Sequence, residues 1–273
     1  MHRLANIDRR VIYLVVAVMV FLPMYRPIGL PMSVSNQVQN AYDTIDALPE
    51  GAVVLVSPSY TPAADAETWP QTLAICRHLM EKNVRMLWVN LMPESIMYAE
   101  RAIDELAEEF GYRDGEDYVV LPFTAGLQTA VASLGRGLRE TFSVDVHGRR
   151  LNDLPMMDDV QDITDIELIV DFNTGDTSIF YLQQIVNRYN VPLVTGASGV
   201  TVPYLMPYLG TGQLSGLLGG MRGAAEYELL IDAPGSALAG MDAQSLAHLS
   251  IILFIALGNV SYLMTRKKTE EGV

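Results

Sequence analysis

Short apolar runs alternate with amphipathic stretches through the middle of the chain, and this alternation is what most restricts the fold. Five runs have the length and composition of buried strands and a sixth is weaker: 52–56, 85–89, 118–121, 167–171, 191–195 and 227–231. Stretches with helical spacing separate them, at 66–82, 93–110, 126–141 and 177–189, and we expect a further helix within 204–225. Apolar strands separated by helices are typical of a parallel sheet covered on both faces. The alternation therefore predicts an α/β fold, with a doubly wound, mainly parallel, Rossmann-like sheet of five to six strands.

Both ends of the chain are apolar and uncharged. Residues 11–25 and 243–265 carry no charged side chain, and about 20 apolar residues are enough to cross a bilayer. Basic residues flank each run on its terminal side, with Arg9 and Arg10 before the first and Arg266 to Lys268 after the second. By the positive-inside rule, an N-terminal and a C-terminal transmembrane helix place both termini in the cytoplasm. The central domain is then extracytoplasmic, either periplasmic or extracellular.

These features predict five regions along the chain. They are a cytoplasmic tail with the first membrane helix at 1–32, a stalk or helix at 33–50, the α/β domain at 51–234, the second membrane helix with its lead-in at 235–265, and a basic cytoplasmic tail at 266–273. The first region has an alternative reading, because its charged start, apolar core and Ser33-Val34-Ser35 also fit a cleavable signal peptide.

The region outside the membrane is strongly acidic. Between residues 31 and 242 the chain has 29 Asp and Glu against 11 Lys and Arg, so nucleic acid is not an expected partner. Residues 144–165 form an acidic insertion that we expect to be an ordered loop or flap rather than a metal site. The single Cys76 excludes an intrachain disulfide and a cysteine-rich metal centre. We expect no cofactor and no metal.

Polar residues follow the predicted strands, where an open α/β sheet binds its ligands. The candidates for contact with a small polar ligand are Ser57, Ser59, Tyr60, Asn90, Asn173, Thr174, Asp176, Thr195 and Ser198. Small hydroxyl-bearing residues in such turns are suited to hold an oxyanion or a sugar at a helix N-terminus. The same residue types are also ordinary helix caps, and the sequence leaves both interpretations open.

Catalytic motifs are mostly missing. The first strand is followed by Ser57-Pro58-Ser59 rather than a glycine-rich phosphate loop, and no serine-hydrolase elbow is present. Outside the tail and the membrane run, the histidines are His78 and His147, which leaves little for a histidine-based triad. No catalytic residue is predicted. An enzyme would have to use carboxylates, for which Glu94, Asp171 and Asp176 are the candidates.

The stretch 189–221 has no charged side chain and is rich in glycine. Glycines at four-residue spacing on a helix allow another backbone to come close. Three interpretations stay open: a third membrane span, a core helix packed on the sheet, or a docking face for another subunit. The docking face would consist of Tyr204, Tyr208, Gly212, Gly216, Gly219, Gly220 and Gly223.

Three hypotheses about function follow. The first is a two-span membrane protein whose extracytoplasmic domain is a non-catalytic structural or interaction subunit of a membrane complex, with other membrane-protein subunits or a second copy as partners. The second is a domain that binds or senses a small polar ligand at the carboxyl ends of the strands. The third is a membrane-anchored hydrolase or transferase that uses carboxylates.

Overall fold

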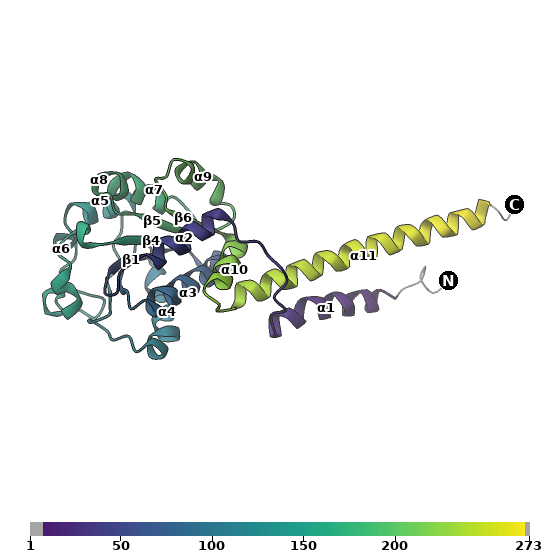
Figure 1. The fold of residues 1–273 in the computed structure, drawn as a ribbon, viewed down its shortest axis with the longest axis horizontal. Helices are drawn as coiled ribbons and strands as arrows, with labels where there is room; N and C mark the ends of the chain where they lie inside the picture. The colour runs from purple at the N-terminus through teal and green to yellow at the C-terminus, as the bar shows by residue number, and fades with distance from the viewer. Residues whose placement is uncertain (1–7, 271–273) are drawn as a thin grey trace. The chain divides into compact units, whose positions relative to one another are not determined.

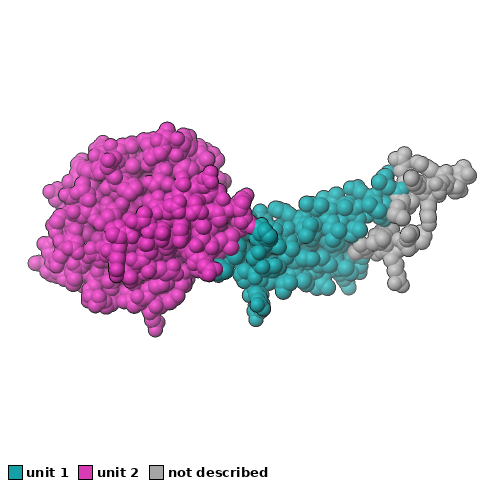
Figure 2. Space-filling view, in the orientation of Figure 1, with its two compact units in different colours: residues 1–31, 234–273 teal, residues 32–233 magenta. Residues whose placement is uncertain are grey.

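The protein consists of two compact units. The structure is a computed structural model that describes residues 8–270, so the outer ends of both predicted tails, 1–7 and 271–273, lie outside the described residues. One unit is the domain Met32–Ala233, and the other joins Met1–Pro31 to Pro234–Val273 (Figure 2).

The domain is built on a six-stranded sheet in which every neighbouring pair is parallel (Figure 1). The strands are β1 Val53–Ser59, β2 Arg85–Trp88, β3 Tyr118–Val120, β4 Leu168–Asn173, β5 Leu193–Ala197 and β6 Gly216–Gly219. Their order is β3-β2-β1-β4-β5-β6, which is the order of a doubly wound, Rossmann-like sheet. The predicted α/β fold class and the five stronger strands are confirmed.

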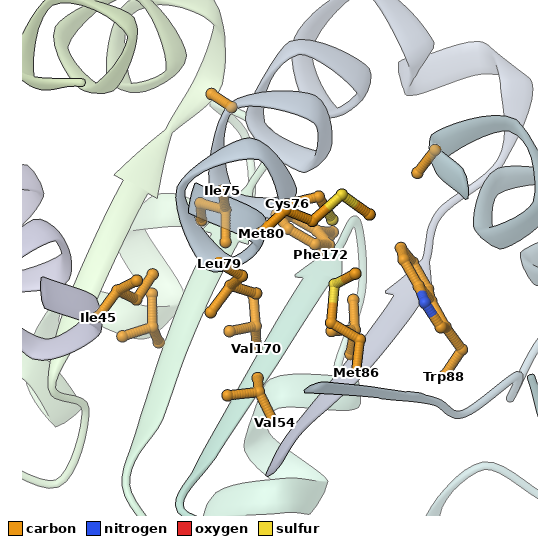
Figure 3. Packing of buried hydrophobic residues seen from close by; sticks show 14 of the residues in the cluster. Ile45, Val54, Ile75, Cys76, Leu79, Met80, Met86, Trp88, Val170 and Phe172 are labelled. Carbon is orange, nitrogen blue, oxygen red and sulfur yellow. The ribbon is translucent and has the colours of Figure 1, made fainter. Parts of the chain in front are cut away.

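Helices cover both faces of this sheet. The domain's helices are α2 Asn36–Asp46, α3 Asp65–Glu81, α4 Ser95–Phe110, α5 Gln128–Arg136, α6 Leu138–Thr141, α7 Thr177–Tyr181, α8 Asn187–Tyr189, α9 Val202–Gly210 and α10 Gly220–Leu230. Helices α2, α3, α4 and α10 pack on one face, where Leu79 lies beside Val170, and Ile45, Val54 and Phe172 belong to the same core cluster (Figure 3). Helices α5, α7 and α9 pack on the other face. Each buried aliphatic side chain of these two layers contributes about 1.5–3 kcal/mol.

The order of strand and helix after β5 differs from the prediction. Residues 227–231, expected as a sixth strand, belong mostly to α10, and the expected helix through Gly212 and Gly223 is interrupted by β6. The four-residue glycine spacing was misleading, because these glycines serve close packing on a strand and at its junction with α10. A Cβ atom on Gly216 would lie 2.4 Å from the Cα atom of Ala41 in α2, so only glycine lets this helix rest on the edge strand.

Smaller differences concern the ends of elements. Strand β1 continues through Ser57 and Ser59, which were expected in a turn, because it stays paired with β4 up to Asn173. The helix predicted at 126–141 is divided at Gly137, whose extended backbone separates α5 from α6. The helix predicted at 177–189 is present, with a π-helical segment at Leu182–Val186 between α7 and α8.

Two regions flanking the sheet are well packed. Helix α2, in the region expected as a stalk or helix, buries Val38, Ala41 and Ile45 in the core of the domain. The acidic insertion contains three short 3-10 helices, Leu151–Asp153, Pro155–Asp159 and Ile163–Asp165. Its apolar side chains, including Met156 and Met157, join the core cluster on the α5 face, while its aspartates are mostly at the surface.

The second unit is a helical hairpin. Helix α1, Arg9–Tyr25, lies antiparallel beside α11, Ser236–Glu270 (Figure 1). Among the described residues, one helix is long and apolar enough to cross a membrane, the Ser236–Leu263 part of α11. Helix α1 has 17 residues and contains Pro23. At 1.5 Å per residue it is about 25 Å long, shorter than the roughly 30 Å of a hydrocarbon core. The predicted C-terminal membrane helix is therefore supported, and the N-terminal one is not shown.

Candidate functional site

The carboxyl ends of β1, β4 and β5 bring polar side chains into one buried cluster. Strand order reverses between β1 and β4, which is where doubly wound domains bind their ligands. Ser57 pairs with Asp171, and Asp171 pairs with Thr195, so these three side chains form a row on one face of the sheet. Side chains alternate along a strand, so Ser59 and Asn173 lie on the same face, two residues further on.

Ser178, in the first turn of α7, connects the members of this cluster. Its hydroxyl donates to Asp171 Oδ2 over 2.7 Å. The same oxygen accepts hydrogen bonds from the Asn173 side-chain amide and, over 3.1 Å, from the Thr195 hydroxyl. A hydroxyl has one proton to donate and two lone pairs, so the Ser178 hydroxyl can make no further hydrogen bond. On β1, the hydroxyls of Ser57 and Ser59 lie 3.0 Å apart and form a hydrogen bond.

Asp171 is the only ionisable carboxyl group in the cluster, and it is completely buried. Burial raises the pKa of Asp171 to about 7, although hydrogen bonds from Ser178, Ser59 and Ser57 oppose the shift. Among the residues that the structure describes, no Lys, Arg or His forms an ion pair with it. A buried carboxylate without a basic partner is costly in its charged form, which is the physical cause of the raised pKa.

Two oxygen atoms of the cluster make no hydrogen bond of regular geometry within the described part of the chain, although the hydroxyls of Ser57 and Ser59 are close enough to influence their pKa values. They are Asp171 Oδ1 and the phenol oxygen of Tyr181, and both side chains are fully buried. Burial raises the pKa of Tyr181, the Asp171 charge raises it further, and the Ser57 hydroxyl opposes both effects. The phenol is therefore close to both the serine and the carboxyl group. Unpaired buried polar atoms are rare in native proteins, so this pair requires an explanation.

The other predicted ligand residues do not join this cluster. Tyr60 is buried, with its hydroxyl 3.1 Å from that of Thr72, and Asn90 donates to the backbone carbonyl of Leu121. Ser198 is buried and exchanges a hydrogen bond with Thr201. Thr174 and Asp176 lie at the surface, and Asp176 precedes α7 without a side-chain capping bond. Of the predicted set, Ser57, Ser59, Asn173 and Thr195 are therefore the ones that the fold brings together.

The candidate enzyme carboxylates are in different environments. Asp171 is buried under α7, whereas Asp176 is exposed and Glu94 is partly exposed at the start of α4. No hydrogen bond or common partner joins any two of them within residues 8–270. A carboxylate pair for acid and base catalysis needs both groups at one reacting centre.

The predicted docking residues divide into an exposed group and a packed group. Tyr204 on α9 is 70% exposed, and Tyr208 is partly exposed. Gly216, Gly219 and Gly223 instead pack against the chain's own Ala41, Val202 and Leu218, while Gly212 is exposed and Gly220 is buried at the start of α10. The glycine part of the predicted face is thus used inside the domain, and the surface that remains is the outer side of α9.

Ser178 and Tyr181 were missed as members of the cluster. They lie three residues apart on one helix, a spacing that places two side chains on one face. The useful signal was Asp171 itself, a charged residue in the middle of the apolar run LIVDF. A charge inside a buried strand indicates that polar partners lie close to it in the fold.

No protein-family model matches this chain, and no curated protein matches its sequence. Its function is therefore inferred from its own residues.

Proposed function

We propose that this chain is a membrane-anchored protein whose extracytoplasmic Rossmann-like domain is a non-catalytic interaction subunit of a membrane complex. The partner is another membrane-protein subunit or a second copy of the chain. The observation that carries this proposal is the uncharged, exposed outer side of α9 and the turn before it. The exposed residues there are Val200, Pro203, Tyr204, Met206 and Pro207.

This surface differs from the rest of an acidic domain. Val200 is 79% exposed and Tyr204 is 70% exposed, and no charged side chain occurs anywhere in residues 189–221. Single exposed apolar residues are normal, but a contiguous group of them is typical of an interaction site. Aromatic residues and methionine are enriched at protein interfaces, and prolines give the surface a rigid shape. The polar strand-end residues, by contrast, are bonded to one another inside the domain.

The hairpin unit supports anchoring by both of its helices. The carboxylate of Asp242 in α11 accepts hydrogen bonds from the backbone N–H groups of Ile28, Gly29 and Leu30, over 2.7, 2.8 and 3.0 Å. This binds the segment after α1 to the beginning of α11. Most large apolar side chains of both helices are exposed, as expected of surfaces that face lipid. We propose that α1 enters the bilayer together with α11, with both termini in the cytoplasm.

Site-specific photo-crosslinking tests the interaction surface. A photoreactive amino acid at Tyr204 or Met206 of the full chain, in its native membrane, should give a discrete adduct that mass spectrometry identifies as one subunit or a second copy. The matched control is Glu108, exposed on α4 across the sheet, which should give no adduct. No adduct at either α9 position, together with a monomer in mild detergent, would contradict the proposal.

Labelling with a membrane-impermeant maleimide tests the topology. Asp8→Cys precedes α1, Asp176→Cys lies on the domain surface, and the native Cys76 is buried. In intact cells Asp176→Cys should react, whereas Asp8→Cys should react only after permeabilisation. Equal labelling of the two variants in intact cells would place α1 outside the bilayer.

Ligand binding at the strand ends is the alternative function. The two unpaired oxygens of the buried cluster favour it, and the burial of Asn173 and Ser198 weighs against a small organic ligand. Thermal-shift screening of the full chain against sugars, amino acids and anions separates the two. Stabilisation by one of these compounds, lost in Asn173→Ala, would support a sensing domain.

A further inference from the structure

One side of α11 is exposed along its whole membrane-length part, and it carries polar residues among isoleucines. Residues four and three apart lie on the same side of a helix. The exposed residues with this spacing, which we call the outer stripe, are His248, Ile252, Ile255, Asn259 and Tyr262. Helix α1 lies along α11 on another side (Figure 1), and the buried or half-buried residues there are Ser250, Phe254, Leu257 and Ser261. The outer stripe is therefore the side of α11 that the hairpin leaves uncovered.

Asn259 lies well inside the proposed membrane span. It precedes Arg266, the first charged residue after the uncharged run, by seven residues. At 1.5 Å per residue, this places it about 10 Å along the helix axis from the arginine. Long side chains such as those of lysine and arginine can reach the interface from inside a bilayer, whereas an asparagine side chain is too short to do so. The amide of Asn259 is thus held at the depth of the lipid tails.

The Asn259 amide has no partner of its own. Within the described residues its side chain makes no hydrogen bond, whereas the Ser250 hydroxyl donates to the Ala247 carbonyl over 2.8 Å. Lipid tails have neither donors nor acceptors, so an amide facing them loses the hydrogen bonds that water would supply. Asparagine in a membrane helix gains such bonds by pairing with another helix.

We propose that α11 pairs in parallel with α11 of a second copy of this chain, through the outer stripe and with Asn259 at the contact. Two copies in one membrane have the same topology, so each presents Asn259 at the same depth. An amide carries both donors and an acceptor, so two asparagines can bond reciprocally across a two-fold axis. The imidazole of His248, on the same stripe, can also donate and accept. A helix of a different protein would need polar residues at both of these depths.

The spacing of the outer stripe fits this kind of pairing. Ile252 and Asn259 are seven residues apart, and Ile255 and Tyr262 follow each of them by three residues. This is the spacing of the a and d positions of a left-handed coiled coil, and many membrane helices cross at the same angle of about +20°. In coiled coils a single asparagine at an a position specifies register and the number of strands. Asn259 holds that position in the pair of α11 helices.

This inference rests on the proposed membrane anchoring and names a second copy as the partner of the anchor. It does not involve the surface on α9. Alkaline carbonate extraction of membranes containing the full chain separates the two proposals. The chain should stay in the membrane pellet. Its release would overturn the anchoring and the pairing with it, whereas a chain that stays in the membrane as a monomer would overturn the pairing alone.

Disulfide cross-linking of the full chain in membranes tests the outer stripe. Ile255→Cys and Tyr262→Cys lie on the stripe, and Leu253→Cys and Val260→Cys lie off it at positions that are also exposed. The native Cys76 is buried, so wild type is the blank. A disulfide requires Cα atoms less than about 7 Å apart, so oxidation with copper phenanthroline should link the stripe variants into dimers and leave the other two mainly monomeric. Equal dimer yields at the four positions would contradict the proposed contact.

Asn259→Leu tests the amide itself. Sedimentation of the full chain in mild detergent measures the dissociation constant of the dimer, which should rise about tenfold in this variant, corresponding to about 1.4 kcal/mol. Asn259→Gln keeps an amide and should retain most of the association. Val260→Leu, beside Asn259 but off the stripe, is the matched control and should leave the constant unchanged. A constant that is the same for wild type and Asn259→Leu, or a wild-type chain that is monomeric at every concentration, would overturn the proposal.

Discussion

Ala41 of α2 packs directly against Gly216 of β6, so closely that a Cβ atom on the glycine would lie 2.4 Å from the alanine Cα atom. This contact fixes α2 on the edge strand of the sheet. It involves backbone on both sides, so a side chain cannot move away to relieve a clash.

Gly216→Ala should therefore destabilise the domain. Overpacking of a well-packed core typically costs about 1–3 kcal/mol, and a clash with backbone belongs at the upper end of that range. Urea unfolding of the full chain in detergent measures the change. Gly210→Ala is the matched control, because a Cβ atom there meets nothing within 4 Å. A wild-type midpoint for Gly216→Ala would mean that α2 does not rest on β6.

Asp171 should make stability depend on pH. Its folded pKa of about 7 lies above the unfolded value of 3.8, so the folded state holds the proton more tightly. The stability that the protonated group contributes is fully present below about pH 4 and is lost as the pH rises to about 7. The total is roughly 4 kcal/mol, by linkage.

The measurement is urea unfolding between pH 4 and 8 at constant ionic strength, for wild type and Asp171→Asn. The difference between the two proteins isolates Asp171, because all other titrating groups are common to both. Wild type should lose stability relative to the variant as the pH rises. Parallel curves over the whole range would show that Asp171 is not buried as described.

The hydrogen bond between His78 and Tyr227 should contribute measurably to stability. His78 Nδ1 lies 2.8 Å from the Tyr227 hydroxyl, and its Nε2 faces the Asp46 carboxylate at 3.6 Å. Since Nε2 must carry the proton toward Asp46, the phenol donates to Nδ1. Tyr227→Phe leaves a buried acceptor unpaired and should cost about 1–2 kcal/mol. Calorimetry measures it, and Tyr204→Phe at the surface should change stability by less than about 0.5 kcal/mol.

His78 also predicts a pH effect of opposite sign to that of Asp171. Burial lowers its pKa below the usual 6.5, so the unfolded chain binds the proton more readily. The stability that neutral His78 contributes is present above pH 6.5 and is lost as the pH falls below that value. NMR titration of the His78 ring should give a midpoint below 6.5. A midpoint at or above 6.5 would contradict its burial.

Asp242 should hold the segment after α1 in place. Asp242→Ala removes the acceptor for three backbone N–H groups. Hydrogen bonds to a charged group are worth about 1.5–3 kcal/mol each, so hydrogen exchange at residues 28–30 should become at least about tenfold faster. Asp176→Ala, an exposed position without a capping bond, is the control and should not change this exchange. Unchanged protection in Asp242→Ala would show that the hairpin is held by other contacts.

The rule that an open α/β sheet binds ligands at the carboxyl ends of its strands identified four members of the cluster from sequence, namely Ser57, Ser59, Asn173 and Thr195. It succeeded because polar residues after apolar parallel strands all reach the same edge of the sheet. It did not find Ser178 and Tyr181, because their approach to Asp171 depends on how α7 lies over β4. Nor could it show that the cluster is closed to solvent, which results from the packing of that helix.

The sequence by itself determined the α/β class, the positions of five strands and a C-terminal helix long and apolar enough to cross a membrane, because each depends on local periodicity and on the length of an apolar run. Only the tertiary structure decided what the glycine-rich stretch does. Glycines four residues apart can occur in a docking helix or in a strand followed by a helix. Their spacing shows only where side chains are absent, and it does not show what packs against those positions. The contacts of Gly216 with Ala41 and of Gly223 with Leu218 show which backbone fills that space. Ala41 is far from Gly216 in the sequence, so local periodicity could not show that these two backbones pack together.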